Sequence, residues 1–288
     1  MGASEDKMIS VIMSCHNSNQ VYLKESIESI LGQTYGDFEL LVADNEVQFD
    51  LQAFVERFKD PRIKYIDNGE NIGPQASYDK LADLAQGEYV AIQDHDDIAL
   101  PRRLEVEKQT LDIKQGVESV SSAIHIFGGT REYDDGKHIE PDDLMGELIF
   151  WQPIKQPTWM KRKRFCEKYK YAPGWMIYDF EFWSRTREIP HWIIGEVLLK
   201  YRKSPSNSTA ERARKIRAEH WVIIKRNLCE LGIYHTDELC KALDPFNKEK
   251  ISREVVQEFK DSKEAYLRHI FEDLYERKLA ELERKVEG

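Results

Sequence analysis

The stretch GEYVAIQDHDD, residues 87–97, decides the fold and indicates the chemistry. Its apolar run at residues 88–92 is typical of a buried strand, and three carboxylates follow within four residues, those of Asp94, Asp96 and Asp97. Like charges this close together are costly unless a cation offsets them, and carboxylate oxygens suit a hard divalent ion such as Mg²⁺ or Mn²⁺. A metal ion at the end of a strand favours phosphate chemistry, and an Asp-rich turn or helix cap is the structural alternative.

The segments before this stretch alternate between strand and helix patterns. Apolar and β-branched runs predict strands at residues 9–14, 38–43, 63–66 and 89–92. Apolar residues at helical spacing predict helices at residues 23–31, 51–58 and 76–84. This alternation predicts a mostly parallel α/β sheet with helices on both faces, in which ligands bind beyond the carboxyl ends of the strands. The polar loops after the four strands would then meet at one edge, as a nucleotide cleft requires.

The chain of 288 residues has room for one large domain or for a domain with an appendage. After residues 204–208, SPSNS, glycine and proline become rare and charge rises. We therefore predict a main domain at residues 8–205 and a charged helical C-terminal extension at residues 206–288. An apolar stripe at helical spacing in the extension comprises Phe271, Tyr275, Leu279, Leu282 and Val286. Such a helix packs either on the main domain or on a second copy of the chain, as a homo-oligomer.

Charge and apolar content narrow the choice of partners. The formal net charge of −10 argues against broad nucleic-acid binding. Two basic clusters, at residues 161–164 and 212–217, are most simply solvated faces, with an anionic acceptor or a membrane surface as alternatives. Nothing resembles a signal peptide, no apolar run approaches the ~20 residues of a membrane span, and the four cysteines are scattered as free thiols are. The predicted location is the cytoplasm, with peripheral contact at the inner face of the membrane left open.

Several motifs follow one another in a fixed order. Residues 9–17 contain ISVIMSCHN, residues 26–40 contain SIESILGQTYGDFEL, and residues 93–104 contain QDHDDIALPRRL. This ordered set, with its Asp-x-Asp segment, resembles the inverting family 2 glycosyltransferases over roughly residues 8–202. The resemblance implies a GT-A fold, a nucleotide-diphospho-sugar as donor, and a divalent cation, Mn²⁺ or Mg²⁺.

The same resemblance implies roles for side chains at the strand ends. Asp96 matches the metal-coordinating aspartate, and Asp94 matches the first aspartate of the motif, near the ribose and the metal. Asp44 matches the aspartate that recognises the base, and a carboxylate is suited to accept a hydrogen bond from a uracil N–H. Ser14 and His16 lie where similar enzymes contact the base and ribose, with loop capping as an equal alternative.

The helix after the third strand departs from the family pattern. Where many relatives carry an arginine and an asparagine near the diphosphate, this chain has Tyr78 and Asp79. The second phosphate contact is therefore left to Asn71, Gln75 or Lys80 as candidates.

The block WMIYDFEFWSR, residues 175–185, resembles the segment that carries the catalytic base. Aligned on Trp183 and Arg185, Asp179 falls on the base. Inversion by direct displacement needs a carboxylate opposite the departing diphosphate, to take the proton from the acceptor hydroxyl. Glu181 would face away in a helix, which favours a surface or capping role over catalysis.

Two tryptophans, Trp159 and Trp175, either offer a platform for a sugar ring or pack in the core. The resulting hypothesis is a metal-dependent inverting glycosyltransferase that moves a sugar from a UDP-linked donor to a carbohydrate or lipid-linked acceptor, in the synthesis of surface polysaccharide. One alternative is a nucleotidyltransferase, although residues 14–20 lack the glycine-rich and basic loop of that class. The other is a nucleotide-binding or scaffold protein with a degenerate cleft.

Overall fold

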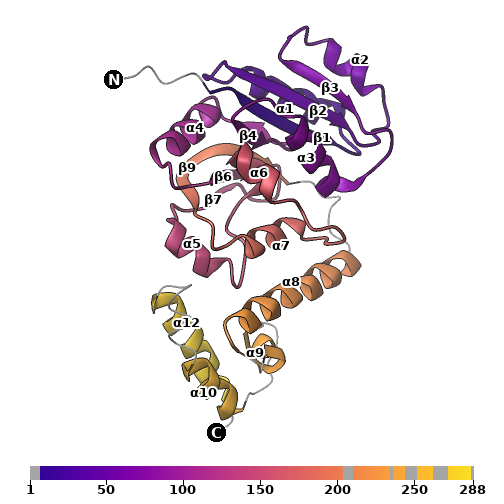
Figure 1. The fold of residues 1–288 in the computed structure, drawn as a ribbon. Helices are drawn as coiled ribbons and strands as arrows, with labels where there is room; N and C mark the ends of the chain where they lie inside the picture. Colours follow the sequence, from indigo (N-terminus) through magenta and orange to yellow (C-terminus); the bar gives the residue numbers. More distant parts are fainter. Residues whose placement is uncertain (1–6, 204–209, 234–235, 244–251, 262–271, 287–288) are drawn as a thin grey trace. The chain divides into compact units, whose positions relative to one another are not determined.

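The computed structural model describes residues 7–203, 210–233, 236–243, 252–261 and 272–286, and Figure 1 shows its elements. The chain forms two compact units. The described part of the first unit comprises residues 7–139, 154–173 and 191–203. The second unit contains residues 140–153 and 174–190 together with the described residues from 210 onward. The two units are therefore interleaved along the sequence, and the predicted domain boundary at residue 205 stays a prediction.

The first unit is built on one mixed, mostly parallel sheet of nine strands. The strands are β1 (Ile9–Cys15), β2 (Phe38–Asp44), β3 (Ile63–Asp67), β4 (Tyr89–Ile92), β5 (Ile98–Ala99), β6 (Ser119–Phe127), β7 (Tyr133–Asp135), β8 (Met160–Arg162) and β9 (His191–Arg202). Their order is β3-β2-β1-β4-β8-β6-β9-β5, and β7 pairs with β6. β1 pairs in parallel with both β2 and β4, while β8 runs antiparallel to β4. The predicted strands and their parallel arrangement are confirmed.

Helices cover both faces of this sheet, as predicted. They are α1 (Gln20–Leu31), α2 (Leu51–Glu56), α3 (Gly73–Leu84), α4 (Arg103–Ile113) and α6 (Lys163–Lys168). Successive residues of a strand point to opposite faces. Alternate residues of β1, from Ile9 to Cys15, belong to the apolar core that also includes residues of α1, α2 and α4. Ser14 points to the other face, where its hydroxyl donates to Ser77 Oγ of α3 at 2.8 Å.

The second unit has helices and a core of its own. Its helices are α5 (Pro141–Glu147), α7 (Tyr178–Arg185), α8 (Ala210–Glu230), α9 (Thr236–Leu243), α10 (Arg253–Asp261) and α12 (Glu272–Glu283). In the predicted apolar stripe, Tyr275 and Leu282 are buried in this core, and the Tyr275 ring stacks on Phe259 with centroids 5.1 Å apart. Leu279 and Val286 pack against the same core, whereas Phe271 lies outside the described residues. Because these side chains pack within the chain, the stripe gives the predicted homo-oligomer no support.

The first basic cluster, at residues 161–164, is not the solvated face that its charge predicts. Lys161 and Arg162 lie in β8, in the interior of the sheet, and are 3% and 7% exposed. The Arg162 guanidinium donates to the carbonyl of Leu111 at 2.6 Å, and Lys161 Nζ lies 3.4 Å from the centroid of the Trp159 ring. The prediction was wrong for these two residues, because a run of four basic residues does not show that two of them belong to a buried strand, whereas Arg164 is exposed.

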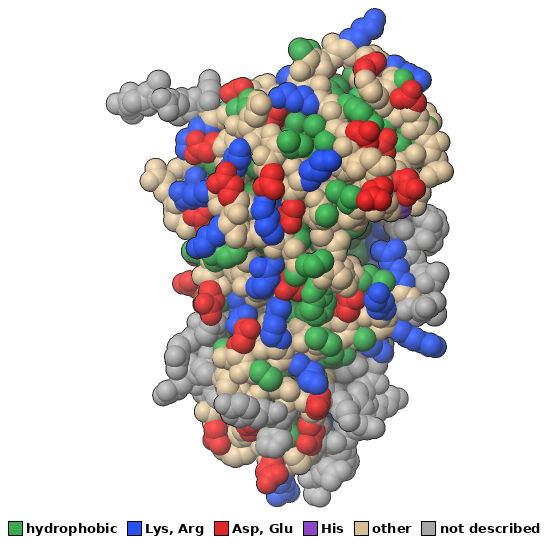
Figure 2. Space-filling model, turned by 45° about the vertical axis from the view of Figure 1, so that its right-hand side comes forward, with side chains coloured by type: hydrophobic (Ala, Val, Ile, Leu, Met, Phe, Trp, Pro, Cys, Tyr) green, Lys and Arg blue, Asp and Glu red, His purple; other side chains and the backbone are tan. Residues whose placement is uncertain are grey.

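The molecular surface carries no single sign of charge. Acidic and basic side chains are interspersed over the face shown in Figure 2. The second basic cluster on α8 is exposed, and it comprises Arg212, Arg214, Lys215 and Arg217. Within the described ranges, no helix is long and apolar enough to cross a membrane.

Candidate active site

The site residues predicted for the first unit lie where the strand order reverses. β1 connects through α1 to β2 on one side, and β4 joins β1 on the other side. In open α/β sheets this switch point leaves a crevice beyond the carboxyl ends of the strands. His16 follows β1 and Asp94 follows β4, so both lie at this edge.

Asn45 connects the loops that follow β1, β2 and β3. It is 1% exposed, and its backbone carbonyl lies 2.9 Å from His16 Nδ1. Its side-chain oxygen accepts from the Ile72 N–H at 3.0 Å and from Asn68 Nδ2 at 3.3 Å, and its amide donates to Asn71 Oδ1 at 3.1 Å. The three loops are thus joined by one buried residue, through its backbone carbonyl and its side-chain amide. Sequence reasoning missed this role of Asn45. Its side chain needs hydrogen-bond partners because it is buried, and it is buried only once the loops pack together.

The chain itself orients the predicted base-recognition carboxylate, Asp44. Its Oδ1 accepts from the Val47 N–H at 3.0 Å, and its Oδ2 accepts from the Tyr65 hydroxyl at 3.4 Å. Burial, with the nearby Asp44 charge, raises the pKa of Tyr65 to about 12, so the phenol stays a donor across the neutral range. Each carboxylate oxygen has a second lone pair left for a ligand.

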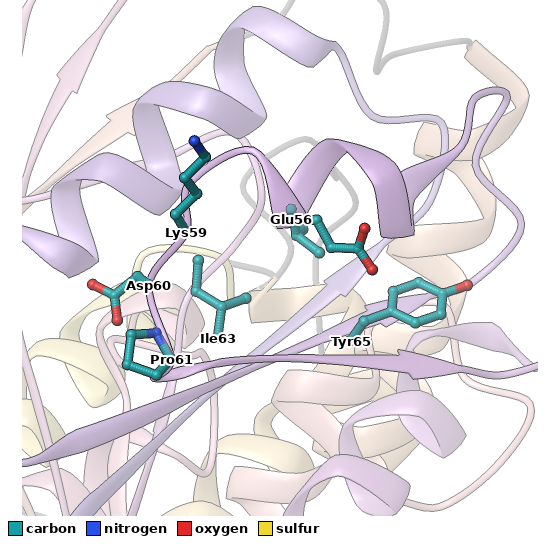
Figure 3. A pocket seen from close by; sticks show the side chains of 7 residues that line it. Glu56, Lys59, Asp60, Pro61, Ile63 and Tyr65 are labelled. Atoms are coloured by element: carbon teal, nitrogen blue, oxygen red, sulfur yellow. The ribbon is translucent and has the colours of Figure 1, made fainter.

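Tyr65 also lines an open pocket of about 410 Å³. The other lining residues come from α2, from the chain that leads into β3 and from the first residue of β3, and they are Val55, Glu56, Lys59, Asp60, Pro61 and Ile63 (Figure 3). None of the predicted site residues is among the residues that line this pocket. Asp44 lies next to it, because it accepts a hydrogen bond from the lining residue Tyr65. We therefore place the candidate site at the strand ends and not in this pocket.

Two other predicted nucleotide contacts already have partners in the chain. Ser14 is buried, and its hydroxyl bonds Ser77. Asn71 Oδ1 accepts from the Gly73 N–H at 3.0 Å and so shapes the start of α3. Nucleotide binding by either residue stays a prediction.

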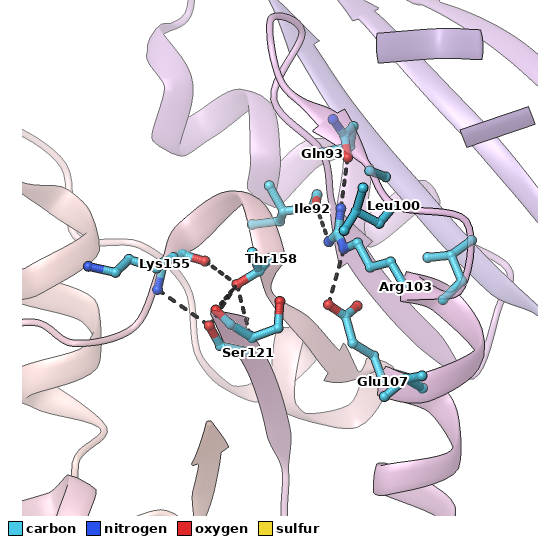
Figure 4. A network of polar contacts seen from close by, with 12 residues as sticks. Ile92, Gln93, Leu100, Arg103, Glu107, Ser121, Lys155 and Thr158 are labelled. Carbon is cyan, nitrogen blue, oxygen red and sulfur yellow. Dashed lines mark hydrogen bonds and ion pairs between the residues drawn. The ribbon is translucent and has the colours of Figure 1, made fainter. Parts of the chain in front are cut away.

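The loop with the three aspartates is held in place by Gln93, and Figure 4 shows the contacts of Arg103 with Gln93, Ile92 and Glu107. The Gln93 side chain is buried, and its amide donates to Ser26 Oγ at 3.0 Å and to the Asp97 carbonyl at 2.9 Å. Its oxygen accepts from Arg103 at 2.7 Å, and the same guanidinium donates to the Ile92 carbonyl at 2.6 Å. A fully buried arginine on α4 therefore fixes the end of β4, which explains why the motif includes residue 103.

Asp94 is half-buried and accepts a 2.6 Å hydrogen bond from the Tyr78 hydroxyl of α3. Burial raises the pKa of Asp94, the Tyr78 hydrogen bond opposes this, and the Asp96 charge adds to it. Asp96 is also half-buried, and in the described part of the chain no hydrogen bond engages its carboxylate. Sequence reasoning missed this contact, because Tyr78 and Asp94 lie sixteen positions apart in the chain.

Asp97 joins the aspartate loop to β9. It is 1% exposed, and its Oδ1 accepts from the Arg202 N–H at 2.8 Å. Burial, with the charges of Asp94 and Asp96, holds the pKa of Asp97 well above its usual range. The Arg202 guanidinium bonds Glu25 at 2.5 Å, which gives it a structural function.

These residues fit a divalent cation that is shared with a substrate. Among the described residues, no three His, Cys, Asp or Glu side chains form a closed metal site. Asp94 and Asp96 instead present two carboxylates within one turn, and Mg²⁺-type ions are commonly held by one or two carboxylates together with phosphate oxygens. Burial, and to a lesser extent the Asp96 charge, raises the pKa of Asp94, and a cation at this position would favour the charged form. The donor set therefore suits Mn²⁺ or Mg²⁺ with a diphosphate.

The predicted base, Asp179, lies in the first turn of α7 in the second unit. Its Oδ2 accepts from Gln152 Nε2 at 3.0 Å and its Oδ1 from the Phe180 N–H at 2.9 Å. Burial raises the pKa of Asp179, which brings a carboxylate closer to the range useful for a general base.

The environment of Glu181 differs from the predicted surface position. It is 2% exposed and forms ion pairs with Arg185 at 3.1 Å and Arg226 at 3.0 Å. A surface role is therefore wrong. The reason is that α8 covers this side of α7, which the spacing within α7 alone does not show.

The tryptophans differ in how far their side chains are exposed to solvent. Trp159 is fully buried in the first unit, so it is core and not a sugar platform. Trp175 is half-buried and packs against the core of the second unit. Trp151 is 43% exposed, and its indole N–H donates to Glu147. Sequence reasoning did not single out Trp151.

Residues 10–188 match the family described as glycosyl transferase family 2. The chain belongs to this family and is a glycosyltransferase. It is 30% identical over 239 residues to an uncharacterized glycosyltransferase of Methanocaldococcus jannaschii, covering 78% of this chain and 81% of that protein. It is 30% identical over 208 residues to an O-antigen biosynthesis glycosyltransferase of Escherichia coli, covering 68% and 79%.

A third relative has a more specific name but a shorter match. It is a UDP-Glc:α-D-GlcNAc-diphosphoundecaprenol β-1,3-glucosyltransferase of Escherichia coli, 33% identical over 103 residues, or 36% of this chain and 40% of that protein. Among solved structures, S. aureus TarS in complex with UDP-GlcNAc is similar with a TM-score of 0.60 at 15% identity, covering 96% of this chain and 88% of that one. A mannosyltransferase of Pyrobaculum calidifontis with GDP-Man and Mn²⁺ gives 0.57 at 15%, covering 89% and 73%. These likenesses confirm the GT-A fold.

Proposed function

We propose that this chain transfers a sugar from a nucleotide-diphospho-sugar, with inversion at the anomeric carbon, to a carbohydrate or lipid-linked acceptor of surface polysaccharide. The observation that carries the proposal is the pair Asp94 and Asp96 at the β1–β4 switch point, beside the loops joined by Asn45. The names of the relatives, which include O-antigen synthesis and a diphosphoundecaprenol acceptor, support the acceptor class.

For the donor, we propose a UDP-linked sugar. Asp44 would accept the imide N–H of the base, and His16 would contact the ribose from the end of β1. Both side chains are oriented by contacts of the chain, with Asp44 bonded by Tyr65 and His16 by Asn45. The structural neighbours are named with UDP-GlcNAc and with GDP-Man, so the fold accepts either base.

Asp94 and Asp96 would hold Mn²⁺ or Mg²⁺ against the diphosphate of the donor. The bound cation stabilises the charge that develops on the departing diphosphate, as a Lewis acid. Tyr78 holds the Asp94 side chain through its hydroxyl. Gln93 holds the backbone of the loop that carries both carboxylates.

Asp179 would take the proton of the attacking acceptor hydroxyl. As the acceptor oxygen bonds the anomeric carbon, the bond from that carbon to the diphosphate oxygen breaks and the proton passes to the carboxylate. Gln152 fixes the orientation of the carboxylate. Trp151, whose ring is exposed next to Gln152, would offer an apolar face to the acceptor sugar. The exposed basic residues of α8 are suited to an anionic membrane surface on the cytoplasmic side.

The experiment that tests this function is a donor panel. The purified protein is incubated with UDP-sugars and GDP-sugars, with Mn²⁺ or with EDTA, and the released nucleoside diphosphate is measured. We expect release from a UDP-sugar that requires Mn²⁺ and is lost in Asp96→Asn. Release of pyrophosphate would instead indicate nucleotidyl transfer, and nucleotide binding without any turnover would indicate a scaffold.

A further inference from the structure

Helix α8, from the predicted extension, forms hydrogen bonds with the start and with later turns of helix α7, which carries Asp179. At the start of α7, Glu219 Oε2 accepts the backbone N–H groups of Met176 at 2.7 Å and Ile177 at 3.1 Å. A carboxylate that accepts two backbone N–H groups forms charge-assisted hydrogen bonds, which are the stronger kind. Glu219 thus fixes the turn from which α7 begins.

A second set of bonds lies one to two turns further along both helices. Arg226 donates to Glu181 at 3.0 Å and to Ser184 Oγ at 2.9 Å, and the Ser184 hydroxyl donates to Asn227 Oδ1 at 2.8 Å. Positions 219, 226 and 227 share one face of α8, since seven or eight residues make two turns. Residues later in α8 contact residues later in α7, so the two helices run side by side in the same direction.

Asn227 links α7 to the second segment that contacts Asp179. It is fully buried, and its amide donates to the carbonyls of Ile149 at 2.9 Å and Leu148 at 3.4 Å. That segment continues to Gln152, whose amide donates to Asp179. One side chain of α8 therefore joins both supports of the proposed base.

The apolar contacts follow the same path. Ile223 and Ile224 of α8 are buried in one cluster with Phe180, the residue that follows the proposed base. The Phe180 ring also lies 4.9 Å from the His220 ring, centroid to centroid. α7 has only eight residues, so its position depends on these neighbours more than on its own helical hydrogen bonds.

We propose that α8 is the positioning element of the catalytic base, with Glu219 and Asn227 as positioning residues. The extension thereby takes part in the transfer step itself. This inference rests on the proposed function, because it takes Asp179 as the base. A carboxylate displaced by about 1 Å can cost up to about 100-fold in rate, so loss of one anchor reduces turnover without changing donor binding.

The test compares three variants of the full chain. Glu219→Ala removes the acceptor of the two N–H groups, and Glu219→Gln keeps an acceptor oxygen. Lys225→Gln is the control, because it removes an ion pair of α8 with Asp237 of α9. For each variant we measure kcat and KM for transfer, the Kd for UDP with Mn²⁺ by calorimetry, and hydrogen exchange in residues 176–185.

Glu219→Ala should lower kcat about tenfold or more and speed exchange at the start of α7, with Kd for UDP unchanged. Glu219→Gln should recover most of both losses, and Lys225→Gln should match the wild type. Wild-type kcat and exchange in Glu219→Ala would overturn the inference, as would an equal loss of UDP affinity, which indicates general destabilisation.

Asp179→Asn separates the failure of this inference from failure of the proposed function. Full transfer in Asp179→Asn would reject the base and with it the positioning of that base by α8. Inactive Asp179→Asn together with fully active Glu219→Ala would reject the inference alone. If Glu219→Ala does not fold, Asn227→Ser is tested instead, because it keeps a hydroxyl that can bond Ser184. The same measurements apply. We expect a reduced kcat, and a wild-type kcat would contradict the inference.

Discussion

Neutral side chains orient the aspartates of the proposed site, since Tyr78 donates to Asp94 and Gln152 donates to Asp179. Asp94, Asp96 and Asp179 could be predicted as site residues because acidic residues beside a strand or at a helix start are visible in the sequence. Tyr78 and Asn45 were not assigned a function, because their partners lie in other loops. A motif shows which residues carry charge, but the buried donors that orient them emerge only from packing.

The first prediction at this scale concerns Tyr78→Phe, which removes the 2.6 Å hydrogen bond to Asp94. A hydrogen bond to a charged group contributes about 1.5 kcal/mol, so affinity for UDP with Mn²⁺ should weaken about tenfold. Titration calorimetry measures this. Tyr89→Phe is the matched control, since it removes a 2.6 Å bond to Asp112 outside the site. Equal Kd values in the two variants would mean that Tyr78 does not position Asp94.

The second prediction concerns the pH dependence of transfer. Burial raises the pKa of Asp179, and the Gln152 hydrogen bond lowers it. Gln152→Leu should therefore raise this pKa further, so that the carboxylate forms only at higher pH. The acidic limb of the kcat profile should move to higher pH, with activity recovered above it. An unshifted limb would show that Asp179 is not the group that titrates.

The third prediction uses the same raised pKa for stability. An acid whose folded pKa lies above its unfolded value costs stability as pH rises from the unfolded value through the folded one. Asp179→Asn removes this cost. At pH 8 the variant should unfold at a denaturant concentration equal to or higher than that of the wild type, and at pH 4 the difference should shrink. A less stable variant at pH 8 would contradict the direction of the shift.

Among the secondary-structure elements, α4 shows how a helix holds a functional loop. The strands and helices around it were predictable, because periods of two and 3.6 residues are local properties of the sequence. The sequence did not predict the environment of Arg103 in α4, because charged residues are usually exposed. Arg103 is fully buried and bonds Gln93, Ile92 and Glu107. The same limit explains the error at Lys161 and Arg162 in β8.

The prediction for this element is that Arg103→Met destabilises the fold strongly. It leaves the Glu107 carboxylate, which is also fully buried, without its partner, and breaking a buried ion pair costs about 3–5 kcal/mol. Denaturant unfolding measures the loss. The double variant Arg103→Met with Glu107→Leu should recover part of it, because no unpaired charge remains. A single variant within about 1 kcal/mol of the wild type would show that the pair does not stabilise the loop.

For the whole molecule, the family and the sheet followed from the order of motifs, whereas the division into units did not. Segments 140–153 and 174–190 pack with helices that follow residue 210, so the unit that carries Asp179 is assembled from three parts of the sequence. Composition changes after residue 204, but it cannot show which earlier segments the later helices cover. The bonds from α8 to α7 are the consequence that matters for function.

The measurement that tests the central claim most directly is single-turnover transfer by Asp179→Asn, with UDP binding followed in parallel. The account predicts that this variant binds UDP and Mn²⁺ as the wild type does, yet forms no glycosidic product. It also predicts that Asp96→Asn loses metal-dependent binding. Product formation by Asp179→Asn at the wild-type rate would contradict the claim that these carboxylates share one inverting reaction.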